Sequence, residues 1–255
     1  MSWLTDLSLI HYLLLVVIIA FAGLVHGTMG IGFPMVATPL ITVFMDVRSA
    51  ILFTLLPTVM VNVASIWLSG NYQNIFRQYW WLFFAALIGA LIGSYLLVIF
   101  DPSPFRLVLA FLIFLFLVTT FSDRLSNPWV SADNYLVMAA FGFVAGVSAG
   151  TTNVMVAVLV IYLLGIGLKR LEMIPILNTC FLLDKTAQIG VLGLEGFVSS
   201  MLVYQTIPLS MVALAALLMG RRIGKKMGME TYRMILYGLL FVLACTLIMQ
   251  FIVET

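Results

Sequence analysis

Short polar stretches divide the sequence into ten apolar runs, and this pattern constrains the fold more than any other feature. The runs cover residues 9–27, 33–45, 49–69, 79–100, 105–121, 135–148, 153–168, 174–194, 197–219 and 232–253. Most of them approach or exceed the roughly 20 helical residues that cross a hydrocarbon core. Because their apolar character is continuous, unlike the alternation of a barrel strand, the pattern predicts an all-α integral membrane protein, a polytopic helical bundle.

The composition agrees with a membrane protein. The chain is 64% hydrophobic and only 9% charged, whereas about a quarter of the residues are charged in a soluble domain. The net charge of +2 gives no reason to expect a nucleic-acid partner. Cys180 and Cys245 lie inside apolar runs, so we interpret them as buried small side chains and not as a disulfide or metal site. The first run lacks a basic preceding region and a cleavage site, so we expect it to stay as a membrane segment.

Three runs are too short for a simple span, and an internal repeat accounts for them. Runs 33–45, 135–148 and 153–168 are predicted to be half-helices or re-entrant pieces. Seven residues recur 120 positions later, namely Val17, Phe21, Gly30, Met35, Val36, Ala37 and Ile41. We therefore predict two repeats of five segments, residues 1–121 and 122–255, within one membrane domain. An odd number of segments per repeat makes the second repeat inverted.

The basic residues predict the orientation of the chain. If the segments alternate sides, one face carries Arg77, Arg124, Lys169, Arg170, Arg221, Arg222, Lys225, Lys226 and Arg233. The other face carries Arg48 and Arg106. The richer face is predicted to be cytoplasmic, which places both termini in the periplasm of a bacterial inner membrane. The cluster at 220–228, GRRIGKKMG, is interpreted as an anchor at anionic lipid headgroups.

Two breaks in the apolar runs predict a binding site. Gly30 and Gly32 permit unusual dihedral angles, and a proline follows them in the position favoured at a helix start. In the second repeat, Thr151, Thr152 and Asn153 are residue types that cap helix starts and donate hydrogen bonds. In inverted repeats two such starts meet near the midplane, where unpaired amides and helix dipoles favour an oxyanion.

Close helix packing is the alternative explanation for the glycines near these breaks. Gly23 and Gly27, like Gly142, Gly146 and Gly150, are spaced by four residues, which is common at helix interfaces in membranes. We favour the binding site because both halves have a matched break followed by residues that start helices.

A family resemblance rests on the same residues. The run Gly23, Gly27, Gly30, Gly32 with Pro39, and its weaker echo in the second half, resemble the motif of the 4-toluene sulfonate uptake permease family, also called TauE/SafE. The resemblance covers nearly the whole chain and implies a permease for sulfonates, sulfoacetate, sulfite or a related sulfur anion. The sequence GTTN stands where the family pattern has a further glycine run.

Further polar residues inside the apolar runs complete the predicted site. Asp184 and Lys185 lie mid-run, where a charge must face protein or a cavity, so Lys185 is a candidate ligand and Asp184 a candidate for proton coupling. A structural ion pair between them is the alternative, although neighbouring residues point about 100° apart on a helix. The other candidates for substrate contact are His26, Phe33, Thr58, Asn62, Gly150 and Asn178. Thr179 aligns with Thr58 in the second repeat, and for His26 a structural role is slightly favoured.

Other functional classes are less well supported. The sequence contains neither Gly-x-Ser-x-Gly nor His-Glu-x-x-His, so we expect no catalytic residues, metal or cofactor. A passive anion channel uses similar broken helices and stays an alternative, as does an exporter of sulfite. The coupling, to protons or to the membrane potential, and the oligomeric state are left open.

Overall fold

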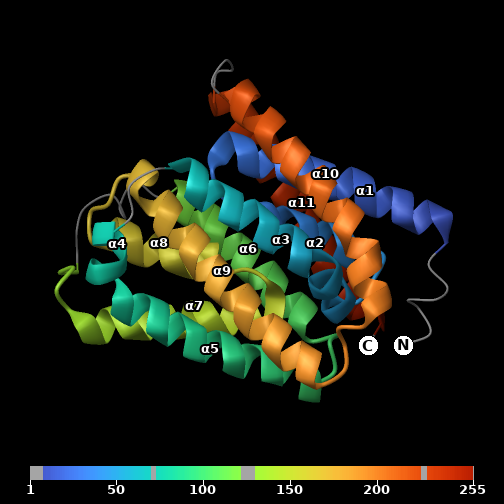
Figure 1. Ribbon diagram of the computed structural model, residues 1–255, viewed down its shortest axis with the longest axis horizontal. Helices are drawn as coiled ribbons and strands as arrows, with labels where there is room; N and C mark the ends of the chain where they lie inside the picture. Colours follow the sequence, from blue (N-terminus) through green and yellow to red (C-terminus); the bar gives the residue numbers. More distant parts are fainter. Residues whose placement is uncertain (1–7, 70–72, 122–129, 225–228, 255) are drawn as a thin grey trace.

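The computed structural model describes residues 8–69, 73–121, 130–224 and 229–254, and within these ranges it contains helices and no strand. The helices are α1 (Leu9–Met29), α2 (Phe33–Thr42), α3 (Val47–Ser69), α4 (Gln73–Gln78), α5 (Trp80–Ile99), α6 (Phe105–Phe121), α7 (Tyr135–Thr152), α8 (Val156–Gly165), α9 (Arg170–Leu194), α10 (Ser200–Gly224) and α11 (Met229–Glu254). Each predicted run corresponds to one helix, and α4 is the helix that was not predicted. The all-helical bundle is therefore confirmed (Figure 1).

Six of the described helices are long and apolar enough to cross a membrane: α1, α3, α5, α7, α10 and the described part of α11. The prediction of a short segment at 135–148 is wrong, because α7 continues through Thr152 and reaches 18 residues. The helix α9 has 25 residues but is not among the six, since it carries Asp184 and Lys185 in its middle. The helices α2 and α8 have ten residues each, about 15 Å, which is half of a hydrocarbon core.

Both half-helices fold back along the helix before them. The ring of Phe44, just after α2, stacks on His11 near the start of α1, with centroids 6.0 Å apart. In the second half, the Val130 N–H donates to the Gly165 carbonyl at 3.1 Å, which joins the end of α8 to the segment before α7. Each pair therefore leaves on the side where it entered, as the topology prediction requires.

Glycines let two pairs of helices approach closely. The helix α1 packs along α10, and α5 packs along α7. A Cβ atom at Gly23 would lie 2.7 Å from the Ala213 carbonyl oxygen of α10, and one at Gly150 would lie 2.6 Å from that of Ala90 in α5. Gly27, Gly142 and Gly146 face neighbouring backbone in the same way. Helix packing, the alternative explanation, therefore accounts for these glycines.

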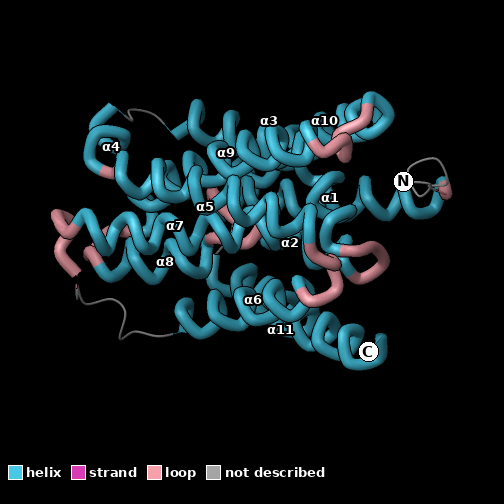
Figure 2. Tube along the Cα trace, turned by 90° about the horizontal axis from the view of Figure 1, so that it is seen from below, coloured by secondary structure: helices cyan, strands magenta, loops and turns pink. Residues whose placement is uncertain are grey.

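The helix contacts have the pattern expected of two related halves. Suppose that α1 corresponds to α7, α3 to α9 and α5 to α10. The contact of α1 with α10 is then equivalent to that of α7 with α5, and the contact of α3 with α10 is equivalent to that of α9 with α5. The helices α3 and α9 contact each other and lie on one side of the bundle in Figure 2, with α6 and α11 together on the opposite side. The inverted repeat with its boundary after residue 121 stays a prediction that this pattern supports.

Basic residues separate between the two ends of the bundle. The short helix α4 with Arg77 and the start of α9 next to Lys169 lie on the left in Figure 1, and the end of α10 with Arg221 and Arg222 lies at the top. The start of α1 and the end of α11 lie on the right. Arg124, Lys225 and Lys226 lie outside the described residues. The assignment of one end to the cytoplasm stays a prediction.

The outer surface of the bundle is apolar, as in a protein surrounded by lipid. Large hydrophobic side chains are exposed on α1, α5, α6 and α11, among them Val17, Phe84, Phe111 and Val242. Cys180 is buried and Cys245 half-buried, and both are free thiols.

Candidate functional site

The first predicted break is a short glycine turn between α1 and α2. Gly30 ends α1 with φ 80°, and Gly32 precedes α2 with φ 102°. A side chain is strained at such positive φ values, so glycine is required by the backbone at both positions. The predicted helix start at Phe33 and Pro34 is confirmed.

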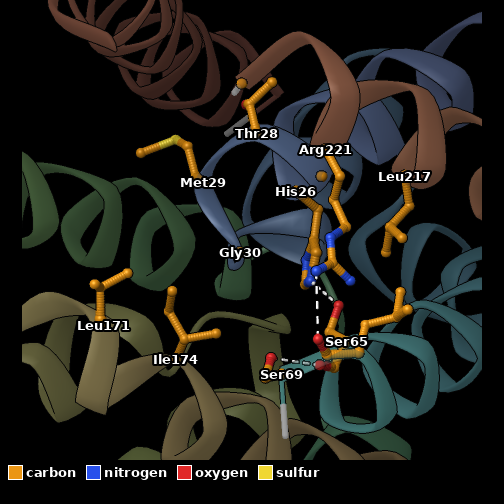
Figure 3. Close-up of a pocket in the computed structure, with 13 residues that line it drawn as sticks. His26, Thr28, Met29, Gly30, Ser65, Ser69, Leu171, Ile174, Leu217 and Arg221 are labelled. Atoms are coloured by element: carbon orange, nitrogen blue, oxygen red, sulfur yellow. Dashed lines mark hydrogen bonds between the residues drawn. The ribbon is translucent and has the colours of Figure 1, made fainter. Parts of the chain in front are cut away.

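His26 fastens this turn to the rest of the protein. Its Nδ1 accepts a hydrogen bond from the Phe33 N–H at 3.2 Å, and its Nε2 lies 2.8 Å from the Ser65 hydroxyl on α3 (Figure 3). Because Nδ1 accepts, the neutral ring carries its proton on Nε2 and donates it to Ser65. The structure therefore favours the structural role for His26, and the Phe33 amide at the start of α2 already has a protein acceptor. The contacts predicted between substrate and Gly30, Gly32 or Phe33 stay predictions, and the Phe33 side chain is fully buried.

The second break differs from the prediction. Thr151 and Thr152 do not start a helix but form the last turn of α7. Their hydroxyls donate to carbonyl oxygens of their own helix, Thr151 to Val147 at 2.9 Å and Thr152 to Ser148 at 2.7 Å. Because these donors are used within α7, neither hydroxyl is free to cap α8. The helix α8 begins at Val156 without a side-chain cap.

Asn153 ends α7 and occupies the centre of a buried polar cluster. Its φ of 65° makes it the one residue other than glycine with positive φ in the described chain, a conformation that asparagine tolerates at helix ends. Its amide nitrogen donates to the Thr38 hydroxyl of α2 at 3.0 Å and to the Thr54 hydroxyl of α3 at 2.8 Å. Its side-chain oxygen accepts from Lys185 of α9. Asn153 therefore joins three helices to the end of α7.

Lys185 supplies a buried positive charge to this cluster. Its side chain is 0% exposed and its Nζ donates to the side-chain oxygens of Asn153 and Gln188. The Asp184 carboxylate, 1% exposed, lies 2.8 Å from the same Nζ. The long lysine side chain bridges the 100° between neighbouring positions, so the ion pair forms although their Cβ atoms diverge. We call Asn153, Asp184, Lys185 and Gln188 the polar node.

Gln188 ties the node back to α7. Its amide nitrogen donates to the Ala149 carbonyl at 3.0 Å, with Gly150 and Asn153 oxygens at 3.3 Å each. The predicted candidate Gly150 therefore contributes a carbonyl oxygen to the node's surroundings, while its missing side chain serves the contact with α5. Lys185 thus donates hydrogen bonds to Asn153 and Gln188 and forms an ion pair with Asp184, and both donors of the Asn153 amide are used.

Three further candidates lie between the node and one end of the bundle. Thr58 and Asn62 are fully buried on α3, and the Thr58 hydroxyl and both polar atoms of Asn62 have no hydrogen-bond partner among the described residues. On α9, the Asn178 amide nitrogen donates to the Gly30 carbonyl at 2.9 Å, while its side-chain oxygen is unpartnered. Such groups are rare in protein interiors and mark a place where a polar occupant gains hydrogen bonds. Thr179 is buried.

A cavity of about 530 Å³ lies beyond these residues. It is bounded by the end of α1, the end of α3, the start of α9 and the end of α10, on the side that carries Arg221. A line of polar side chains on α3 runs from the cavity to the node. From the cavity end it consists of Ser69, Ser65, Asn62, Thr58 and Thr54.

The sequence prediction missed several members of the site. Thr38, Thr54 and Ser65 were not candidates, although Thr54 stands one helical turn before Thr58 and continues its face. Gln188 stands three residues after Lys185, a spacing that places both on one face of α9. Thr38, the partner of Asn153 on α2, had no signal in the sequence.

A membrane bundle with half-helices, an interior charged node and a polar line leading to a cavity has the architecture of a membrane transporter. The comparison with protein families gives the same class. A model described as Sulfite exporter TauE/SafE matches residues 15–247, so the chain belongs to this family of membrane transporters. No curated protein and no solved structure matched the chain.

Proposed function

We propose that this protein is a secondary transporter that carries a sulfur oxyanion or organosulfonate across the bacterial cytoplasmic membrane. The observation that carries the proposal is the buried ammonium of Lys185, which lies among hydrogen-bonding side chains from α3, α7 and α9. A charge inside a membrane protein is retained mainly where it serves transport or ligand binding. The substrate's oxygen atoms bind at the node, where Lys185 and Asn153 exchange protein acceptors for the anion.

The charge of the node bears on coupling. Lys185 and Asp184 neutralise each other, so an entering anion adds a net negative charge to a buried site. Uptake of a proton by Asp184 restores neutrality, and both of its oxygens lack a hydrogen-bond donor in the described structure. We therefore propose that a proton accompanies the anion and resides on the Asp184 carboxyl.

The path runs between α3 and α9. Thr58, Asn62 and Asn178 offer unpartnered polar atoms along it, and the cavity lies at its end. With the basic end of the bundle in the cytoplasm, the cavity is the cytoplasmic entrance, and both termini are periplasmic. Export of sulfite is the second candidate function, favoured by the family's description.

Transport into liposomes tests the proposal. Purified protein is expected to give saturable flux of sulfite or a small organosulfonate that an inward proton gradient accelerates. Asn153→Leu removes the hydrogen bonds to α2, α3 and α9, and flux is expected to fall at least tenfold. Thr152→Val is the matched control, since the hydroxyl it removes bonds within α7, and it is expected to keep more than half of the flux. Non-saturating flux would instead identify a channel, and equal activity of both variants would exclude the node.

A further inference from the structure

The cavity carries a positive charge that has no counter-ion among the described residues. Arg221 of α10 lines it, and one guanidinium nitrogen donates to the Leu68 carbonyl of α3 at 3.3 Å. Within the described part of the chain, Arg221 has no ion pair. His26 also lines the cavity, and both nitrogens of its imidazole are engaged with Phe33 and Ser65 (Figure 3). The guanidinium therefore has donors left for a ligand.

The opposite part of the cavity is apolar. Leu171 and Ile174 at the start of α9 contribute aliphatic side chains there, whereas Leu217 of α10 lies on the same side as Arg221 (Figure 3). Leu171 is 81% exposed, which is high for a leucine that lines a cavity. The cavity thus presents a cation on one wall and hydrocarbon on the other.

This combination matches one class of sulfur anion better than another. A guanidinium pairs with two oxygens of a sulfonate at once, in the same geometry as with a carboxylate or phosphate. An alkyl group attached to the sulfur gains free energy when it leaves water for an apolar wall. Sulfite and sulfate have no such group. The node offers polar contacts to the oxygens of the anion.

We propose that this cavity is a second, cytoplasmic anion site that selects organosulfonates with an apolar tail, by Arg221 for the sulfonate and by Leu171 and Ile174 for the tail. This proposal rests on the proposed function, because substrate passes from the cavity to the node. Arg221 binds the substrate before it passes Asn62 and Thr58, and the site sets the apparent affinity for substrate on the cytoplasmic face.

Equilibrium binding to the full-length protein in detergent tests the site without requiring transport. The probes are alkanesulfonates from methanesulfonate to hexanesulfonate, with sulfite as the tail-free reference. Affinity is expected to rise with chain length, by up to about fourfold for each added methylene group. Arg221→Gln is expected to weaken hexanesulfonate binding by about 10- to 100-fold. Arg222→Gln is the matched control, because it removes the same charge from a neighbouring residue that is exposed and does not line the cavity.

A second variant keeps the test decisive if Arg221→Gln folds poorly. Leu171→Ser changes an exposed residue and is expected to flatten the chain-length dependence while methanesulfonate binding stays within about twofold of wild type. Affinity that does not depend on chain length, or equal effects of Arg221→Gln and Arg222→Gln, would overturn the second site. If the second site fails this test, the proposed function still stands when the wild-type protein transports the anion and Asn153→Leu does not. A wild-type protein that neither binds nor transports any of these anions contradicts both.

Discussion

The ion pair of Asp184 and Lys185 allows the structural and ligand roles of the node to be measured separately. Both side chains are almost completely buried, and the carboxylate lies 2.8 Å from Nζ. Asp184→Asn leaves the ammonium without a counter-ion, and Lys185→Gln leaves the carboxylate without one. Removal of one partner of a buried pair destabilises a protein by about 3–5 kcal/mol, so we expect each single variant to lose this much.

The double variant Asp184→Asn with Lys185→Gln removes both charges. The introduced glutamine amide still donates to Asn153 and Gln188, whose oxygens now receive hydrogen bonds from Lys185. We therefore expect the free energy of unfolding of the double variant to lie within about 2 kcal/mol of the wild-type value, a difference that corresponds to one or two imperfect hydrogen bonds. Its anion binding should nevertheless stay lost, because no positive charge remains at the node.

Denaturant unfolding in detergent, read by tryptophan fluorescence, measures stability, and isothermal titration with a small sulfonate measures affinity. Thr186→Val serves as the control, because this neighbouring residue is exposed and its hydroxyl bonds within α9. Single variants as stable as wild type would refute the ion pair. A double variant that recovers both stability and normal anion affinity would show that Lys185 is structural and not a ligand.

Two further predictions concern packing and orientation. Gly142→Ala places a Cβ atom 2.5 Å from the Leu82 carbonyl oxygen and should destabilise the protein by about 1–3 kcal/mol, whereas Gly190→Ala meets nothing within 4 Å and should be neutral or stabilising in the same unfolding assay. The orientation is tested with a membrane-impermeant maleimide in a background with Cys180 and Cys245 replaced by alanine. Arg222→Cys should react only after the cytoplasmic face is opened, whereas Arg48→Cys should react from the periplasm. The reverse pattern would contradict the predicted orientation.

The fold could be predicted because membrane segments are encoded locally. Apolar runs define the helices, and the glycines at 30 and 32 mark a break that needs positive φ. The second break was misread for a tertiary reason. Thr151 and Thr152 have a local preference for helix starts, but they also bond well to their own helix in an apolar interior, and the close contact of α7 with α5 keeps this turn helical.

The site could be predicted only in part. Lys185 and Asp184 were found because a charge in an apolar run is conspicuous in any sequence. Arg221 was found only as a topology marker, since a basic residue at a helix end looks the same whether it faces lipid headgroups or a cavity. Thr38 lies 115 residues from its partner Asn153, and no spacing rule connects positions so far apart.

The position of Asn153 explains why a helix break and a buried charge occur together. With φ at 65°, Asn153 ends α7 inside the protein and turns the chain into α8, so its side chain is free to reach α2, α3 and α9 instead of following α7. The same amide that marks the end of α7 is thus the acceptor for Lys185. Movement of α3 or α9 relative to α7 must break these hydrogen bonds, and an unpaired ammonium in a membrane interior is costly. An anion that replaces the lost acceptors lowers this barrier. In the carrier proposed above, occupancy of the node is thereby coupled to movement of the helices around it, which is the requirement for a carrier that changes conformation only when loaded.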